Sequence, residues 1–138
     1  MKKANTNPAV SSAAATKRKR AKIKCKKIFI YVNSTFNNTL ISATKPNGDV
    51  LCQASAGSTG FKGSRKSTPH AAKTAADSVA QKVKEFGAEE ADIFVGGPGA
   101  GRESAIRGIR EGGLIVRRLI DITKLPHNGC RPRKKRRT

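Results

Sequence analysis

The sequence predicts one α/β domain with a five-stranded mixed sheet, helices on its faces, and a basic extension at each end. Apolar residues alternate with a period of two in five short segments and recur every three or four positions in two others. Along the chain these segments give the order βββαβαβ, which is typical of a mixed sheet with crossover helices. Residues 1–27 contain ten Lys and Arg, residues 124–138 contain seven, and neither stretch contains an acid. We therefore divide the chain into a basic extension (1–25), a domain (26–123) and a basic tail (124–138).

The first three elements are strands. At 26–33, apolar side chains alternate onto both faces, which predicts a central strand covered on both sides. Strands at 38–44 and 50–56 follow, and the sequence Lys-Pro-Asn-Gly-Asp at 45–49 joins them. Proline fixes one turn dihedral and Asn-Gly tolerates positive φ, so this sequence predicts a hairpin turn.

The pattern changes period at Thr68 and Pro69, which are a hydroxyl cap and a proline at the first helical position. Apolar residues at spacings of three and four then predict a helix that ends at Gly87. Its small alanines allow close packing against a sheet. The domain continues with a strand at 91–95, a glycine loop at 96–101, a helix at 103–111 and a strand at 114–123.

The net charge of the chain is +20, although the segment 28–123 holds twelve bases against nine acids. Like charges at the density of the two ends repel each other, so the ends need a polyanion, and nucleic acid is the favoured partner.

Three widely spaced cysteines indicate a reducing compartment rather than a disulfide framework. No apolar run reaches the roughly 18 residues of a membrane span. The Ser/Ala-rich start weakly resembles a transit peptide, but the cluster of bases at 17–27 favours an RNA-binding arm.

The loop at 57–67 joins a strand to a helix and is the strongest candidate for phosphate binding. Its glycines allow successive N–H groups to point one way, and its cations, its hydroxyls and the helix dipole all favour an anion. The candidate residues are Ser58, Lys62, Gly63, Ser64, Arg65 and Lys66. Two interpretations of Phe61 remain, stacking on a base or burial in the core, and burial is the commoner fate of an aromatic ring.

The tail after Pro126 is a second candidate. Prolines and an Asn-Gly turn stiffen its path, and arginines can hold a phosphate with two bonds each. Its candidate residues are His127, Asn128, Arg131, Arg133, Lys134, Lys135, Arg136 and Arg137, and those of the N-terminal extension are Lys17, Arg18, Lys19 and Arg20. The alternative is a disordered, solubilising tail.

Nucleotide binding is not favoured by the glycine loop. The loop partly matches a phosphate-binding motif, but Arg102 and Glu103 stand where that motif needs a lysine and a hydroxyl. A tight strand-to-helix turn, near an RNA backbone or a protein neighbour, fits these residues better.

Catalysis and metal binding are not favoured either. A metal-dependent nuclease needs convergent carboxylates, and the first strand contains no acid. Four other acids do not obviously converge on one metal site: Asp49, Asp77, Glu85 and Asp121. His127 and Cys130 supply only half of a zinc site. We expect no enzyme, metal, cofactor or small-molecule substrate.

Four motifs occur in order along the chain: FNNT at 36–39, ASAGSTGFKGSRKSTP at 54–69, GPGAGRESAIRGI at 97–109 and PHNGCRPRKKRR at 126–137. Together they closely resemble the family of ribosomal small-subunit protein eleven in its bacterial form, over about residues 26–137. The resemblance implies an RNase H-like fold without its catalytic carboxylates. It also implies a structural role in binding rRNA on the platform of the small subunit, near the mRNA exit.

By the same resemblance, the neighbours are small-subunit proteins six, seven and eighteen, and the location is the small ribosomal subunit of the cytoplasm or of a plastid. Carried over by motif, the segments 57–67 and 127–137 contact rRNA, and Asn37 and Asn38 lie near it. Two other functions stay open on the residues alone. A DNA-compacting protein shares the charge but would need helices or ribbons suited to a groove. A nucleotide-using enzyme would need the glycine loop to bind a phosphate.

Overall fold

The computed structural model describes residues 25–135 and residue 137, so the predictions for Lys17, Arg18, Lys19, Arg20 and Arg136 lie outside the described residues. The elements are β1 (Lys27–Ser34), β2 (Thr39–Thr44), β3 (Val50–Ser55), the 3-10 helix η1 (Gly63–Ser67), α1 (Pro69–Glu85), β4 (Glu90–Gly96), α2 (Gly101–Glu111) and β5 (Ile115–Asp121). The predicted order and the five-stranded mixed sheet are confirmed, and η1 is an addition within the loop at 57–67. No helix in the described part of the chain is long and apolar enough to cross a bilayer.

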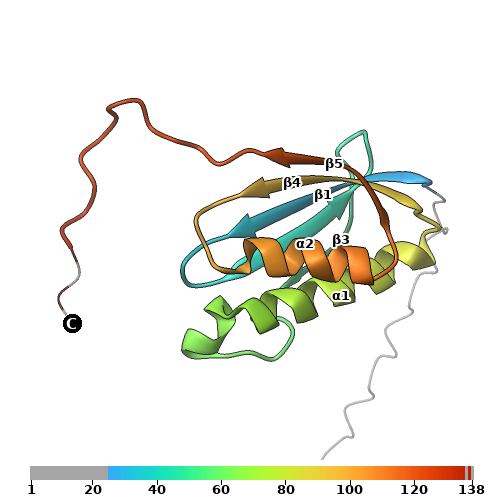
Figure 1. The fold of residues 1–138 in the computed structure, drawn as a ribbon, viewed down its shortest axis with the longest axis horizontal. Helices are drawn as coiled ribbons and strands as arrows, with labels where there is room; N and C mark the ends of the chain where they lie inside the picture. Colours follow the sequence, from blue (N-terminus) through green and yellow to red (C-terminus); the bar gives the residue numbers. More distant parts are fainter. Residues whose placement is uncertain (1–24, 136, 138) are drawn as a thin grey trace, which may run out of the picture.

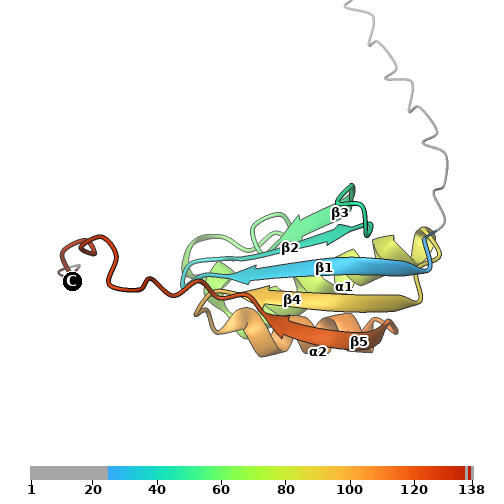
Figure 2. The same ribbon diagram turned by 90° about the horizontal axis from the view of Figure 1, so that it is seen from above.

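The strand order in the sheet is β3-β2-β1-β4-β5, so β1 is central, as the sequence predicts (Figure 2). Strand β1 pairs antiparallel with β2 and parallel with β4, and β4 pairs parallel with β5. Because β3 is antiparallel to β2, it runs in the same direction as β1, β4 and β5. Four of the five strands therefore end at the same edge of the sheet.

Both helices lie on one face of the sheet (Figures 1 and 2). The connections β3-α1-β4 and β4-α2-β5 both step in the same direction across the sheet. Because such crossovers are right-handed, both helices come to the same side. The expectation that β1 is covered on both sides is therefore wrong within the described structure: Ile28, Ile30 and Val32 are buried under the helices, whereas Tyr31 on the other face is 38% exposed.

The core between sheet and helices consists almost entirely of Ile, Val and Ala. Small residues let the helices approach closely, because the backbone of Gly101, Gly108 and Gly112 in and just after α2 lies directly against alanine methyl groups of α1. A Cβ at any of these glycines would collide with that alanine. The alanines of α1 therefore allow close packing against α2 as well as the predicted packing against the sheet.

Candidate nucleic-acid interface

Four segments meet at the edge where β1, β3, β4 and β5 end (Figure 1). They are the β1–β2 turn at 35–38, the loop at 56–68, the β4–α2 turn at 97–100 and the chain after β5. The carboxyl ends of parallel strands are the usual place for binding loops in α/β folds. The described chain begins at the opposite end, where the N–H of Cys25 donates to the carbonyl of Phe86 after α1 (3.2 Å).

The loop at 57–67 is held by its own hydrogen bonds. The hydroxyl of Ser58 accepts from the N–H of Ser55 (2.8 Å) and donates to the carbonyl of Ser55 (2.9 Å). The N–H groups of Thr59, Gly60 and Phe61 donate to carbonyls within the same turn. Because these donors are already used, fewer N–H groups face outward than the glycines suggest, and attraction for phosphate must come mainly from side chains.

The loop also does not run directly into the long helix. Helix η1 intervenes, and Thr68 then caps α1 by accepting a hydrogen bond from the N–H of Ala71 (3.3 Å), with Pro69 at the first helical position. The capping prediction is confirmed. However, the 3-10 turn separates the N-terminus of α1 from the glycine-rich first half of the loop and from Lys62, so the helix dipole contributes less there than the sequence suggests.

The cations of this loop project from its surface. Lys62 and Arg65 are exposed, and Lys66 is half-buried with its stem across Gly57. None of the three lies within ion-pair distance of a carboxylate among residues 25–135 and 137. They line or flank a shallow hollow of about 420 Å³ between Thr59 and Arg65. Unopposed cations around a hollow suit a polyanion.

Phe61 is half-buried and does not stand free. Its ring packs edge-on against His70 in the first turn of α1, with 5.8 Å between ring centroids. This contact favours the packing interpretation of Phe61 over base stacking.

The β1–β2 turn places Asn37 and Asn38 beside the loop. Thr35 closes the turn, because its N–H and its hydroxyl both donate to the carbonyl of Asn38 (2.9 Å each). Asn37 is exposed, whereas the side-chain oxygen of Asn38 is buried without a hydrogen-bond partner in the described structure. Phe36 is 74% exposed at the tip of the turn.

The tail leaves the domain after β5 and extends away from it (Figures 1 and 2). All its described side chains are exposed, and Asn128 adopts a left-handed conformation (φ 54°), which an Asn-Gly turn accommodates. Within the described residues, no carboxylate pairs with a tail cation. The candidates His127, Asn128, Arg131, Arg133, Lys134, Lys135 and Arg137 therefore lie on one extended segment.

The glycines of the β4–α2 turn are needed for packing against β1. A Cβ at Gly97 would collide with the carbonyl of Ser34, and one at Gly99 with the carbonyl of Thr35. The space that a nucleotide phosphate would need is therefore occupied by the chain itself. Arg102 donates to the carbonyl of Gly97 within this turn (2.6 Å) and to Asp121 at the end of β5. The interpretation as a tight structural turn accounts for all these contacts.

Sequence reasoning missed Asp92, which is completely buried on β4. It accepts two hydrogen bonds from Arg118 (2.7 and 3.2 Å) and lies 3.4 Å from the ammonium of Lys27. The hydrogen bonds from Arg118, followed by that from Lys27, lower the pKa of the Asp92 carboxyl against the opposing effect of burial. The signal was a charged residue within each of three predicted strands, but only the strand register shows that these residues meet.

No group of three potential metal ligands exists among the described residues, and His127 and Cys130 are both exposed in the tail.

Comparison with known proteins identifies the family of the chain. The model of the family described as ribosomal protein S11 matches residues 28–137. The chain is 54% identical over 119 residues to a protein of Oltmannsiellopsis viridis named small ribosomal subunit protein uS11c, an alignment that covers 86% of this chain and 92% of the relative.

Proposed function

The chain belongs to the ribosomal protein S11 family, whose members are structural, non-enzymatic components of the small ribosomal subunit, and from this premise we propose that it stabilises rRNA of the platform near the mRNA exit. Its place of action is the small ribosomal subunit, in the cytoplasm or in a plastid. Its cations hold one conformation of the central-domain rRNA by neutralising closely spaced phosphates.

The observation that carries the proposal is the meeting of unpaired cations at one edge of the sheet. The loop at 57–67 and the start of the tail lie at the end where four strands of the same direction finish. Lys62, Arg65 and the described cations of the tail are exposed. Two basic segments that are about 60 positions apart in sequence can therefore grip one RNA surface. The N-terminal candidates at 17–20 would add contacts from a separate segment.

We also propose small-subunit proteins six, seven and eighteen as neighbours, which rests on the family resemblance alone. The residues predicted to touch rRNA, including Asn37 and Asn38 in the β1–β2 turn, remain predictions. For Ser58 the structure supplies a restriction. Its hydroxyl already donates a hydrogen bond to the carbonyl of Ser55, so it can donate to RNA only if that bond breaks.

The test is the affinity of the full chain for a central-domain small-subunit rRNA fragment, measured at several salt concentrations with unrelated duplex DNA as competitor. Neutralising about eight to ten phosphates predicts a slope of log K against log salt near −7 or steeper. DNA should compete poorly. If DNA competes equally well at the same slope, the protein is a general polycation, and rRNA recognition on the platform is refuted.

A further inference from the structure

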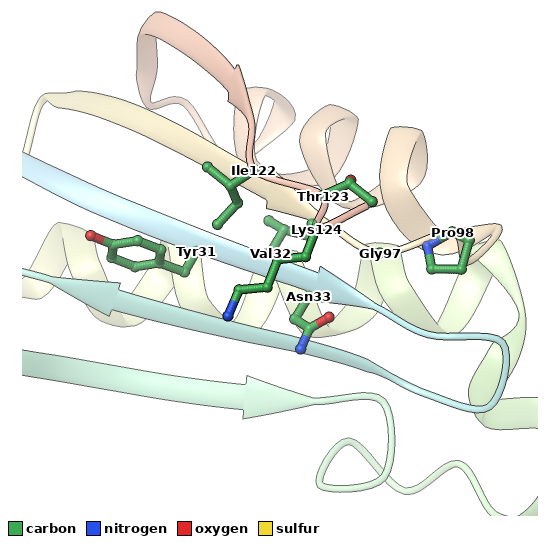
Figure 3. Close-up of a pocket in the computed structure, with 9 residues that line it drawn as sticks. Tyr31, Val32, Asn33, Gly97, Pro98, Ile122, Thr123 and Lys124 are labelled. Carbon is green, nitrogen blue, oxygen red and sulfur yellow. The ribbon is translucent and has the colours of Figure 1, made fainter. Parts of the chain in front are cut away.

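A cavity of about 410 Å³ opens on the face of the sheet that the helices leave uncovered. It lies at the carboxyl ends of β1 and β4, where Tyr31 and Asn33 form one wall (Figure 3). Pro98 of the β4–α2 turn and Ile122 and Lys124 after β5 form the others. This volume is within the range of roughly 300–1,000 Å³ that is typical of small-molecule sites, so the cavity has room for a nucleobase.

Tyr31 presents an aromatic surface that is held in place. Its ring stacks on Phe94 of the neighbouring strand, with 4.9 Å between centroids and 15° between planes. Phe29 in turn supports Phe94 edge-on at 5.5 Å. Because Tyr31 is 38% exposed and already oriented, a base could stack on it at little cost in side-chain entropy.

Polar groups suited to a nucleotide flank the ring. Asn33 is exposed, and its amide makes no hydrogen bond within the described residues, so it can both donate to and accept from the edge of a base. In Figure 3 the side chain of Lys124 reaches back across β1 toward Tyr31 and Asn33. Lys124 has no carboxylate partner in the part of the chain that the structure describes. It can therefore hold the phosphate of that nucleotide.

The walls of the cavity are braced from behind. Arg102 donates to the carbonyl of Gly97 (2.6 Å), to the hydroxyl of Thr123 (3.0 Å) and to the carboxylate of Asp121. Asp121 also accepts from the N–H of Thr123 (2.8 Å). These bonds fix the β4–α2 turn to the end of β5. The bond from Arg102 also neutralises the carboxylate of Asp121 next to the cavity, so Lys124 makes the local charge at the cavity positive.

From these contacts we propose that the cavity, called here the Tyr31 cavity, holds one unpaired base of the rRNA, stacked on Tyr31 and hydrogen-bonded by Asn33. The inference rests on the proposed function. RNA is favoured over a protein partner because the side chains at the opening are cationic or neutral. Moreover, the basic tail begins at Lys124, which lines the cavity, so an RNA strand bound by the tail would lie next to the opening.

The chain has one tyrosine and no tryptophan, so its intrinsic fluorescence reports on Tyr31 alone. We would measure the fluorescence lifetime of the full chain while adding the central-domain rRNA fragment, because a lifetime is insensitive to absorption by the RNA. Stacking of a base on the ring predicts a shortened lifetime at saturation. An unchanged lifetime in a complex that forms normally overturns the base site and leaves the proposed function intact. Absence of any complex overturns both.

Substitutions give a second readout. We expect Tyr31→Leu to weaken rRNA binding about five- to a hundredfold, the range for loss of one stacked base, while Tyr31→Phe stays within about twofold. The slope with salt should not change in either variant, because no phosphate contact is lost. Asn33→Ala, which leaves the aromatic stack in place, should also weaken binding. Circular dichroism checks that each variant is folded.

Equal affinity of folded Tyr31→Leu and the natural chain would overturn the proposal. A lifetime that responds only when other small-subunit proteins are added, and not to rRNA, would likewise overturn it and assign the cavity to a protein neighbour.

Discussion

In the folded domain, six Lys or Arg side chains lie within ion-pair distance of a carboxylate, whereas none of the described cations after Asp121 does so. The domain pairs include Arg118 with Asp92 and Arg102 with Asp121, which join neighbouring elements. The tail has no acid with which to pair. Basic side chains thus serve two purposes, since paired cations fix the geometry of the domain and unpaired cations remain available for a polyanion.

The loop at 57–67 shares features with both the folded domain and the tail. It is built on the fold, with its own hydrogen bonds and a capped helix after it, yet its cations are unpaired like those of the tail. If the comparison is correct, removing unpaired cations should affect RNA binding and not stability. Removing a paired group should do the reverse.

The largest effect is expected from deleting residues 125–138, which removes six Lys and Arg. If each neutralises one phosphate, the magnitude of the salt slope falls by about four to five, and affinity near 0.1 M salt falls about a thousandfold or more. The free energy of unfolding should change by less than about 0.5 kcal/mol, because the tail packs on nothing in the described structure. Binding titrations and urea unfolding measure the two effects. An unchanged salt slope would refute a phosphate-gripping tail.

A smaller effect is expected from replacing Lys62, Arg65 and Lys66 together with alanine. Loss of up to three phosphate contacts should lower the magnitude of the slope by about two to three and the affinity about ten- to a hundredfold. The matched control replaces three exposed cations at the opposite end of the molecule, namely Lys82, Lys84 and Arg110. Equal loss of affinity in both triple variants would show that net charge, not the position of the loop, determines binding.

The element order was predictable because it depends on local signals. A period of two or of three to four, a Thr-Pro cap and an Asn-Gly turn all act within a few residues. The phosphate-binding candidates were also found locally, because the loop and the tail are continuous segments rich in bases.

The sites that escaped prediction depend on register between strands. Asp92 meets Arg118 across 26 positions, and the pairing is shifted by an irregularity between Ala91 and Asp92. The stack of Tyr31 on Phe94 likewise needs β1 and β4 to be parallel neighbours. The uncovered face of the sheet follows from two right-handed crossovers in one direction, which requires the strand order as well as the strands.

Among the paired groups, Asp92→Asn should destabilise the domain by about 1–3 kcal/mol, because the carboxylate is fully buried and accepts charged hydrogen bonds. Its control is Asp49→Asn at the exposed pair with Lys45 (3.0 Å), which should cost less than about 1 kcal/mol. Urea unfolding measures both. The affinity for rRNA should not fall in either variant, since each loses a negative charge. Similar destabilisation by the two substitutions would argue against a special role for the buried pair.

The smallest effect concerns the protonation of Asp121. Its pKa is lowered from 3.8 to about 2, first by the hydroxyl of Thr123, then by the N–H of Thr123 and by Arg102. A lowered pKa stabilises the fold above the unfolded value, so this contribution is complete above about pH 5 and disappears as the pH falls from about 4 to about 2. Carbon NMR of the Asp121 carboxyl should give the low midpoint in the natural chain.

In Thr123→Ala the same midpoint should rise toward 3.8, because the strongest stabilising hydrogen bond is lost. A midpoint that stays near 2 would assign the effect to the remaining backbone N–H at position 123 and to Arg102 instead. In either case Asp121 remains ionised at neutral pH and remains paired with Arg102. Among the described residues, Lys124, the first residue of the tail, is then the unpaired cation next to the Tyr31 cavity that can bind a phosphate.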